Sequence, residues 1–86
     1  MTGAEKKGVR DIIAELADGR VNAAKLKAGA RIREDLGFDS ILLIDLMVEL
    51  EARFGLYFEP LSPEMDTVFT TVGALEAFVK ANGKKE

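Results

Sequence analysis

The residue with the clearest potential for chemistry is Ser40, which follows the acid Asp39 and heads a markedly apolar run. A serine attacks a substrate only when a base within hydrogen-bond reach, usually histidine and in some enzymes lysine, takes its proton. The chain has no histidine, and no lysine or arginine lies between Glu34 and Arg53. The glycine-flanked turn that exposes a nucleophilic serine in many hydrolases is also missing. We therefore expect that the chain is not an enzyme and has no catalytic residue.

Two other roles suit Ser40. Serine and aspartate are common N-cap residues, so either Ser40 or Asp39 is expected to cap the helix that follows. Alternatively, another protein modifies the Ser40 hydroxyl. A helix N-terminus favours an attached phosphodiester, because its free backbone N–H groups and the positive end of the helix dipole attract an anion. The chain then needs no catalytic machinery of its own, because its chemistry arrives with the attached group.

Helices must position these residues, because apolar spacing and end signals predict helices and no convincing strand. Apolar residues at 9, 12, 13 and 16 share one helix face, and Thr2 with Glu5 has the pattern of a capping box. Gly19 and Gly55 are natural helix ends, and the run SPE at 62–64 is a strong helix start. We predict helices at residues 3–17, 40–54, a short stretch that starts at 62–64, and 71–82.

The segment between the first two helices, residues 20–38, shows no sustained periodicity. We expect a long ordered loop there, with one short turn after Asn22, and loops of this length inside compact domains are often functional. The 86 residues contain no internal repeat and are short enough to form a single domain, 1–86. The predicted fold class is all-α, a four-helix bundle with three longer helices and one short helix.

The helix over 40–54 carries more apolar residues than one core-facing side can use. At 100° per residue, one stripe is an ordinary core-facing set: Leu43, Leu46, Met47, Leu50 and Phe54. A second stripe of Ile41, Ile44 and Val48 lies apart from it. An exposed apolar stripe beside acids is typical of a partner-binding surface. The alternative is that the short helix covers this second stripe.

The charge is distributed unevenly along the chain. The net charge is −3, but residues 34–66 hold nine acids and one base, Arg53. Such a segment repels nucleic-acid phosphates and attracts basic protein surfaces, although a solvated helix face is the ordinary alternative. We expect no metal, because the chain has no cysteine and its acids lack the spacing of a calcium loop. A polar N-terminus without a long apolar run predicts a cytoplasmic protein that does not enter a membrane.

The run REDLGFDSI (33–41) resembles the phosphopantetheine attachment motif of acyl carrier proteins, in which Leu-Gly precedes Asp-Ser-Leu. The likeness continues through LMVELEARFGL (46–56) and TTVGALEAFV (70–79), and so covers nearly the whole chain. It implies a four-helix bundle with 4′-phosphopantetheine attached to the Ser40 hydroxyl through a phosphodiester. Asp39 would be the acidic neighbour of that group. Asp45 and Glu51 stand where the family places acids that meet basic partner surfaces.

The resemblance also implies the partners. They are a phosphopantetheinyl transferase and the acyl- or aminoacyl-loading and condensing enzymes that exchange thioesters with the arm. Members of fatty acid synthesis tend to have leucine and then a polar residue after the serine, whereas this chain has Ile41 and Leu42. Arg53 stands where an acid is frequent. These departures favour a stand-alone, monomeric carrier of a specialised polyketide, nonribosomal peptide or hybrid pathway.

Two classes of protein without a prosthetic group are alternatives. One is a helical adaptor that binds proteins through the acidic and apolar surface of the 40–54 helix. The other is an interaction module that is phosphorylated at Ser40. The mass gained by the protein when it is incubated with a transferase separates both of them from a carrier.

Overall fold

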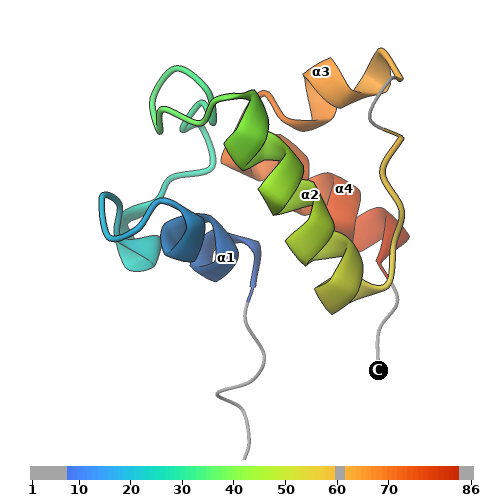
Figure 1. Cartoon of the computed structure of the whole chain (residues 1–86), viewed down its shortest axis with the longest axis horizontal. Helices are drawn as coiled ribbons and strands as arrows, with labels where there is room; N and C mark the ends of the chain where they lie inside the picture. The colour runs from blue at the N-terminus through green and yellow to red at the C-terminus, as the bar shows by residue number, and fades with distance from the viewer. Residues whose placement is uncertain (1–7, 60–61, 84–86) are drawn as a thin grey trace, which may run out of the picture.

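The computed structural model describes residues 8–59 and 62–83. Its elements are the helix α1 (Val9–Leu16), a 3₁₀ turn η2 (Ala23–Lys25), and the helices α2 (Ser40–Phe54), α3 (Glu64–Val68) and α4 (Val72–Asn82). Figure 1 shows α2 through the middle of the molecule, with α1 on one side and α3 on the other. Helix α1 packs against α2, η2 and α4, and α3 packs against α4. The predicted all-α class, with three longer helices and one short helix, is confirmed.

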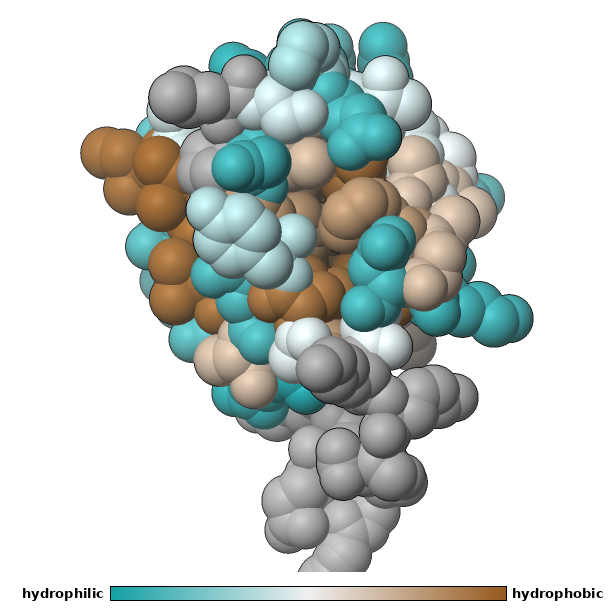
Figure 2. All heavy atoms as spheres, turned by 90° about the vertical axis from the view of Figure 1, so that its right-hand side faces the viewer, coloured by the Kyte–Doolittle hydropathy of each residue, from teal (hydrophilic) through white to brown (hydrophobic). Residues whose placement is uncertain are grey.

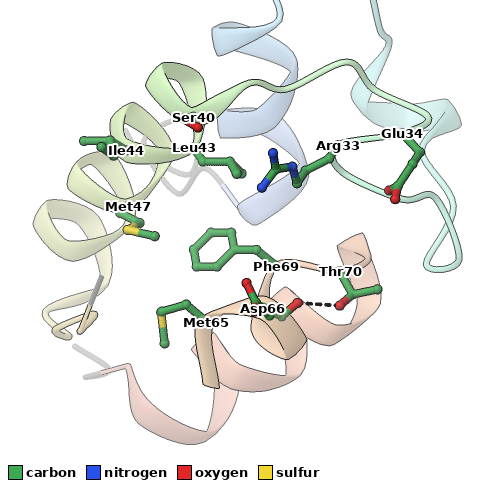
Figure 3. Close-up of a pocket in the computed structure, with 10 residues that line it drawn as sticks. All are labelled: Arg33, Glu34, Ser40, Leu43, Ile44, Met47, Met65, Asp66, Phe69 and Thr70. Atoms are coloured by element: carbon green, nitrogen blue, oxygen red, sulfur yellow. Dashed lines mark hydrogen bonds between the residues drawn. The ribbon is translucent and has the colours of Figure 1, made fainter. Parts of the chain in front are cut away.

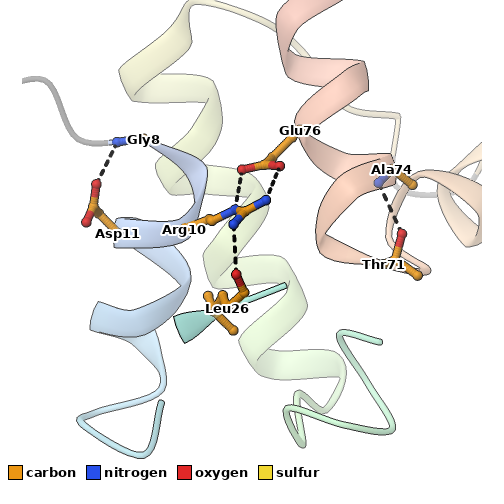
Figure 4. Close-up of polar contacts among 7 residues, drawn as sticks. All are labelled: Gly8, Arg10, Asp11, Leu26, Thr71, Ala74 and Glu76. Atoms are coloured by element: carbon orange, nitrogen blue, oxygen red, sulfur yellow. Dashed lines mark hydrogen bonds and ion pairs between the residues drawn. The ribbon is translucent and has the colours of Figure 1, made fainter. Parts of the chain in front are cut away.

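Helix α1 is shorter than its predicted range of 3–17. The backbone of Gly8 is extended (φ −86°, ψ −179°), so the helix begins at Val9 and the prediction of a helix through residue 8 is wrong. The Gly8 N–H donates to the Asp11 carboxylate at 3.1 Å (Figure 4), which stabilises this start. The proposed capping box of Thr2 and Glu5 lies outside the described residues.

Helix α2 has the predicted bounds, because both of its ends carry strong local signals. The Asp39 side chain accepts a hydrogen bond from the Leu42 N–H at 2.9 Å, so Asp39 is the N-cap. At the other end Gly55 adopts the left-handed conformation, with φ 64°, and its N–H donates to the Glu51 carbonyl at 3.0 Å. The alternative prediction, with Ser40 as the cap, is wrong, because Ser40 is the first residue of the helix proper.

The long loop between α1 and α2 is ordered by its contacts with the start of α4. The predicted turn after Asn22 is the 3₁₀ turn η2, which the Asn22 side chain caps at 2.9 Å. Farther along, the carbonyls of Ala28 and Ala30 accept the N–H groups of Gly73 and Val72 at 2.8 and 2.9 Å. Glycine suits position 73, because a Cβ there would lie only 3.0 Å from the Ala28 carbonyl oxygen and would push the two segments apart. The loop is thereby fixed to α4 and can position the residues that precede α2.

The core joins all four helices and both long connections. Its buried side chains include Ile12, Ile13, Ile32, Leu46, Leu50, Phe58, Val72 and Leu75. Phe58 anchors the connection after α2, and its ring centroid lies 5.2 Å from that of Phe69 and 5.3 Å from that of Phe78. Of the predicted core stripe on α2, Leu43, Leu46 and Leu50 are buried, whereas Met47 and Phe54 are half-buried.

Helices α3 and α4 begin at local capping signals. Helix α3 starts at Glu64, and the Ser62 hydroxyl oxygen accepts the Glu64 N–H at 3.2 Å. Helix α4 starts at Val72, because Thr71 is its N-cap and accepts the Ala74 N–H at 3.1 Å (Figure 4). The short helix therefore begins one residue after the predicted proline, and the last helix ends at Asn82 as predicted.

Candidate functional site

Ser40 lies at the exposed start of α2 with its hydroxyl free. The capping interaction is made by the neighbouring Asp39 carboxylate, so the serine side chain is not needed to hold the helix end. Among residues 8–59 and 62–83, no side chain or backbone group forms a hydrogen bond with the Ser40 hydroxyl. The site can therefore present this hydroxyl to another molecule, but it cannot activate the hydroxyl as an enzyme would.

The turn that leads into Ser40 is held at both ends. Leu36 and Phe38 are buried, with 7% and 2% of their surfaces exposed. Between them Gly37 has φ 74°, a left-handed conformation that glycine adopts without strain. The Arg20 guanidinium also bridges to the turn, because it donates to the Leu36 carbonyl at 3.3 Å. These contacts fix the direction in which the chain enters α2.

An ion pair reinforces the same turn. The Arg31 guanidinium donates to both carboxylate oxygens of Asp35, at 3.0 and 3.2 Å, and the Arg31 backbone N–H donates to one of them at 2.8 Å. The side-chain hydrogen bond, followed by the backbone one, lowers the pKa of Asp35. The Asp35 carboxylate in turn raises the pKa of Arg31. The ion pair therefore closes the turn most firmly when Asp35 is ionised.

The second apolar stripe of α2 is exposed, as predicted. Ile41, Ile44 and Val48 have 71%, 55% and 57% of their surfaces exposed, so α3 does not cover them. Figure 2 shows hydrophobic side chains that stand out along one edge of the molecule among hydrophilic neighbours. We call these three residues the α2 apolar stripe. Because they lie on the helix that Ser40 begins, a protein that contacts the stripe also approaches the serine.

The two acids predicted beside the stripe differ in their surroundings. Asp45 is exposed, and within the described parts of the chain it has no ion-pair partner. Glu51 is half-buried, and its carboxylate accepts the Phe58 N–H at 2.9 Å. Glu51 therefore holds the connection after α2 to the helix, whatever else it contacts. This bond could not be predicted from the sequence, because Phe58 lies seven residues farther along an irregular segment.

A pocket of about 390 Å³ opens beside Ser40, between the start of α2 and α3. Its apolar lining residues are Leu43, Ile44, Met47, Met65 and Phe69. Figure 3 shows the Phe69 ring near the centre of the pocket, whereas Ile44 points away from it. The polar members are Ser40, Arg33, Glu34, Asp66 and Thr70. Sequence reasoning missed this pocket, because its walls come from segments that are distant along the chain.

The comparison with known families identifies the family of the chain. A family model described as "Phosphopantetheine attachment site" matches residues 7–79. The chain belongs to this family. It is a carrier protein that holds 4′-phosphopantetheine covalently, and carriers of this kind are not themselves catalysts. The family interacts with phosphopantetheinyl transferases and biosynthetic enzymes. No curated protein matches the chain.

The residues at the start of α2 fit such a group. The Ser40 hydroxyl is free and exposed, and the first turn of a helix leaves N–H groups without intrahelical partners beside it. A phosphodiester at this place would lie next to those donors. Within the described residues, no helix is long and apolar enough to cross a membrane, and no group of three or more acids could hold a metal ion.

Proposed function

We propose that Ser40 is the residue to which the phosphopantetheine arm is attached. Its free hydroxyl at the start of α2 is the observation that carries the proposal. The Ser40 Oγ–P bond forms as the bond between that phosphorus and the adenosine bisphosphate portion of coenzyme A breaks. The hydroxyl proton passes to a base of the transferase, because no histidine exists in the chain and the described residues place no base against Ser40. Asp39 keeps α2 capped throughout this reaction.

The arm supplies a terminal thiol on which acyl or aminoacyl groups are held as thioesters. We propose that the chain is a stand-alone carrier, working in the cytoplasm as a monomer, that passes such intermediates between separate enzymes. Ile41 and Leu42 after the serine support a specialised polyketide, nonribosomal peptide or hybrid pathway over fatty acid synthesis. Loading trials with acyl and aminoacyl donors, carried out on the protein with its arm attached, distinguish these pathways.

The partner enzymes are proposed to dock on the α2 apolar stripe and the acids beside it. Ile41, Ile44 and Val48 supply apolar area that no other part of the described chain covers. Asp45 supplies an exposed negative charge suited to a basic partner surface. Glu51 stays in the proposed surface, but its bond to the Phe58 N–H means that replacing it would disturb the fold as well as the docking.

The attachment is tested by measuring the intact mass of the protein after incubation with coenzyme A and a broad-specificity transferase. The wild-type chain should gain one phosphopantetheine, and Ser40→Ala should gain none. Ser62→Ala is the matched control and should be modified like the wild type, because Ser62 precedes α3 and holds the Glu64 N–H. Full modification of Ser40→Ala would refute the assignment.

The same measurement separates the alternatives. A protein that binds partners as a helical adaptor gains no mass with the transferase. A module regulated by phosphorylation gains only the mass of a phosphate, and only with a kinase. Either result, obtained with a folded wild-type protein, contradicts the proposal that Ser40 carries the arm.

A further inference from the structure

Arg33 differs from the other arginines in having no partner for its guanidinium. Arg10 donates to the Glu76 carboxylate at 2.7 and 3.0 Å and to the Leu26 carbonyl at 2.7 Å (Figure 4). The guanidinium groups of Arg20, Arg31 and Arg53 are likewise bonded, to backbone carbonyls, to Asp35 and to Glu49. Throughout the parts of the chain that the structure describes, nothing bonds to the guanidinium of Arg33.

This free cation lies in the pocket that Ser40 also lines. Figure 3 shows the Arg33 side chain extended from the loop, with its guanidinium between Leu43 and Phe69, whereas the neighbouring Glu34 points away from the centre of the pocket. Asp66 of α3 also lines the pocket but forms no ion pair with Arg33. Among residues 8–59 and 62–83, no group therefore neutralises the positive charge of Arg33 through a hydrogen bond or an ion pair.

The backbone of Arg33 is fixed although its side chain is free. Its carbonyl accepts the Gly37 N–H at 3.1 Å, and the preceding residue, Ile32, is fully buried and accepts the Phe38 N–H at 3.2 Å. The turn that positions Ser40 thus positions Arg33 as well. A side chain on a fixed backbone loses less conformational freedom on binding than one on a mobile loop.

We propose that Arg33 binds the phosphodiester that joins the arm to Ser40, an inference that rests on the proposed attachment at that serine. A phosphodiester brings a permanent negative charge into the pocket in which Arg33 has no partner. Guanidinium is always charged and presents paired N–H donors that match two phosphate oxygens. The contact holds the root of the arm towards the pocket instead of leaving it free to swing, and Arg33 is thus a positioning residue for the arm.

The test uses the chain with its arm attached, in the wild type, Arg33→Gln, Arg33→Lys and the control Arg53→Gln. Arg53→Gln is a matched control because it also removes one positive charge, near the other end of α2, where the Arg53 guanidinium is paired with Glu49. Intact mass first shows that each protein carries the arm. The ³¹P resonance of the phosphodiester and the ¹H–¹⁵N resonances of the arginine side chains are then recorded.

We expect the Arg33 Nε–H resonance to shift when the arm is attached, while those of Arg10 and Arg31 stay in place. The ³¹P shift of Arg33→Gln should differ from that of the wild type, Arg33→Lys should lie between them, and Arg53→Gln should coincide with the wild type. The difference in ³¹P shift between the wild type and Arg33→Gln should shrink as the salt concentration rises, because the contact is electrostatic. Arg33→Gln should fold normally, since the Arg33 side chain makes no hydrogen bond or ion pair with the residues that the structure describes.

Four results would overturn the inference. If the arm attaches and neither the ³¹P nor the Arg33 resonance changes, Arg33 does not bind the phosphodiester, and the attachment at Ser40 stands. If the resonances change only after cargo is loaded, the guanidinium binds the cargo instead. If Arg33→Gln slows the transferase but its ³¹P shift equals that of the wild type, Arg33 serves the transferase. A wild-type chain that gains no arm at all refutes the proposed function, and the inference fails with it.

Discussion

Replacing Ile44 with glutamine tests whether the α2 apolar stripe is a docking surface. Complete burial of an isoleucine side chain contributes about 1.5–3 kcal/mol to the free energy of unfolding. Ile44 is 55% exposed, so its replacement can remove less than half of that contribution. We expect Ile44→Gln to lower the free energy of unfolding by about 1 kcal/mol. Leu50 is fully buried, and Leu50→Ala should cost about 2–5 kcal/mol because it opens a cavity in the core.

Two assays separate stability from docking. For a domain of this size 1 kcal/mol shifts the melting temperature by roughly 4–8 °C, so Leu50→Ala should shift it at least twice as far as Ile44→Gln. Time courses of transferase modification, followed by intact mass, should show Ile44→Gln modified at least about five-fold more slowly, the factor that corresponds to 1 kcal/mol at a docking contact. Val48→Gln should behave like Ile44→Gln, although Val48 does not line the pocket beside Ser40.

Tyr57→Gln is the matched control for lost apolar surface. Tyr57 is 70% exposed but lies after α2, so its replacement should leave the modification rate unchanged. If Ile44→Gln melts as early as Leu50→Ala, the residue belongs to the core and the stripe is not a surface. If it melts late and is modified at the wild-type rate, the stripe is exposed but the transferase does not dock on it.

Three further predictions concern the acids around Ser40. Asp45→Lys should slow transferase modification at low salt and less so at high salt, with stability changed by no more than about 0.5 kcal/mol; equal rates across a salt series would contradict this. In urea titrations Asp39→Ala should lower the free energy of unfolding by about 0.5–2 kcal/mol, because Asp39 is the N-cap of α2. Ser40→Ala should lower it by less than about 0.5 kcal/mol. Because Arg31 lowers the pKa of Asp35, the wild type should lose stability as the pH falls below about 4. Asp35→Asn should lose less over the same range. If the melting temperatures of both proteins fall equally with pH, the prediction is refuted.

The parts of the fold that could be predicted from the sequence are those with local signals. Asp39 and Gly55 fix the ends of α2 within the helix itself, so its bounds were predictable. The start of α1 was not, because Gly8 permits both helical and extended backbone, and the Asp11 carboxylate that selects the extended form is a weaker signal than a serine or threonine cap.

The anchoring of the connection after α2 depended on contacts that are distant along the chain. Phe58 lies in a segment without periodicity, and its burial comes from Phe69 and Phe78, which the bundle brings together. The same holds for Glu51, whose sequence position suggests a surface acid. A residue's partners in tertiary structure decide its role in such cases, and a single sequence does not display them.

At the candidate site, too, some features could be predicted from the sequence and others depended on tertiary contacts. The exposure of Ile41, Ile44 and Val48 was predictable, because α2 has two apolar stripes and so small a bundle has one core. The availability of Arg33 was not predictable, since it depends on which arginines find carboxylates after folding. Arg31 and Arg33 are two residues apart, yet only Arg31 meets Asp35.

The separation of roles between Asp39 and Ser40 would let one short motif support both folding and the proposed modification. If Ser40 were the N-cap, its oxygen would have to accept a backbone N–H, and an attached phosphodiester would compete with that bond. Because Asp39 accepts the Leu42 N–H, the Ser40 oxygen is not needed to cap the helix, and the proposed modification there would leave the first turn of α2 intact. The buried Leu36 and Phe38 fix the turn before it, so the hydroxyl is free while the backbone that carries it is rigid. A partner enzyme therefore meets a preformed surface, and pays little conformational entropy to reach the serine.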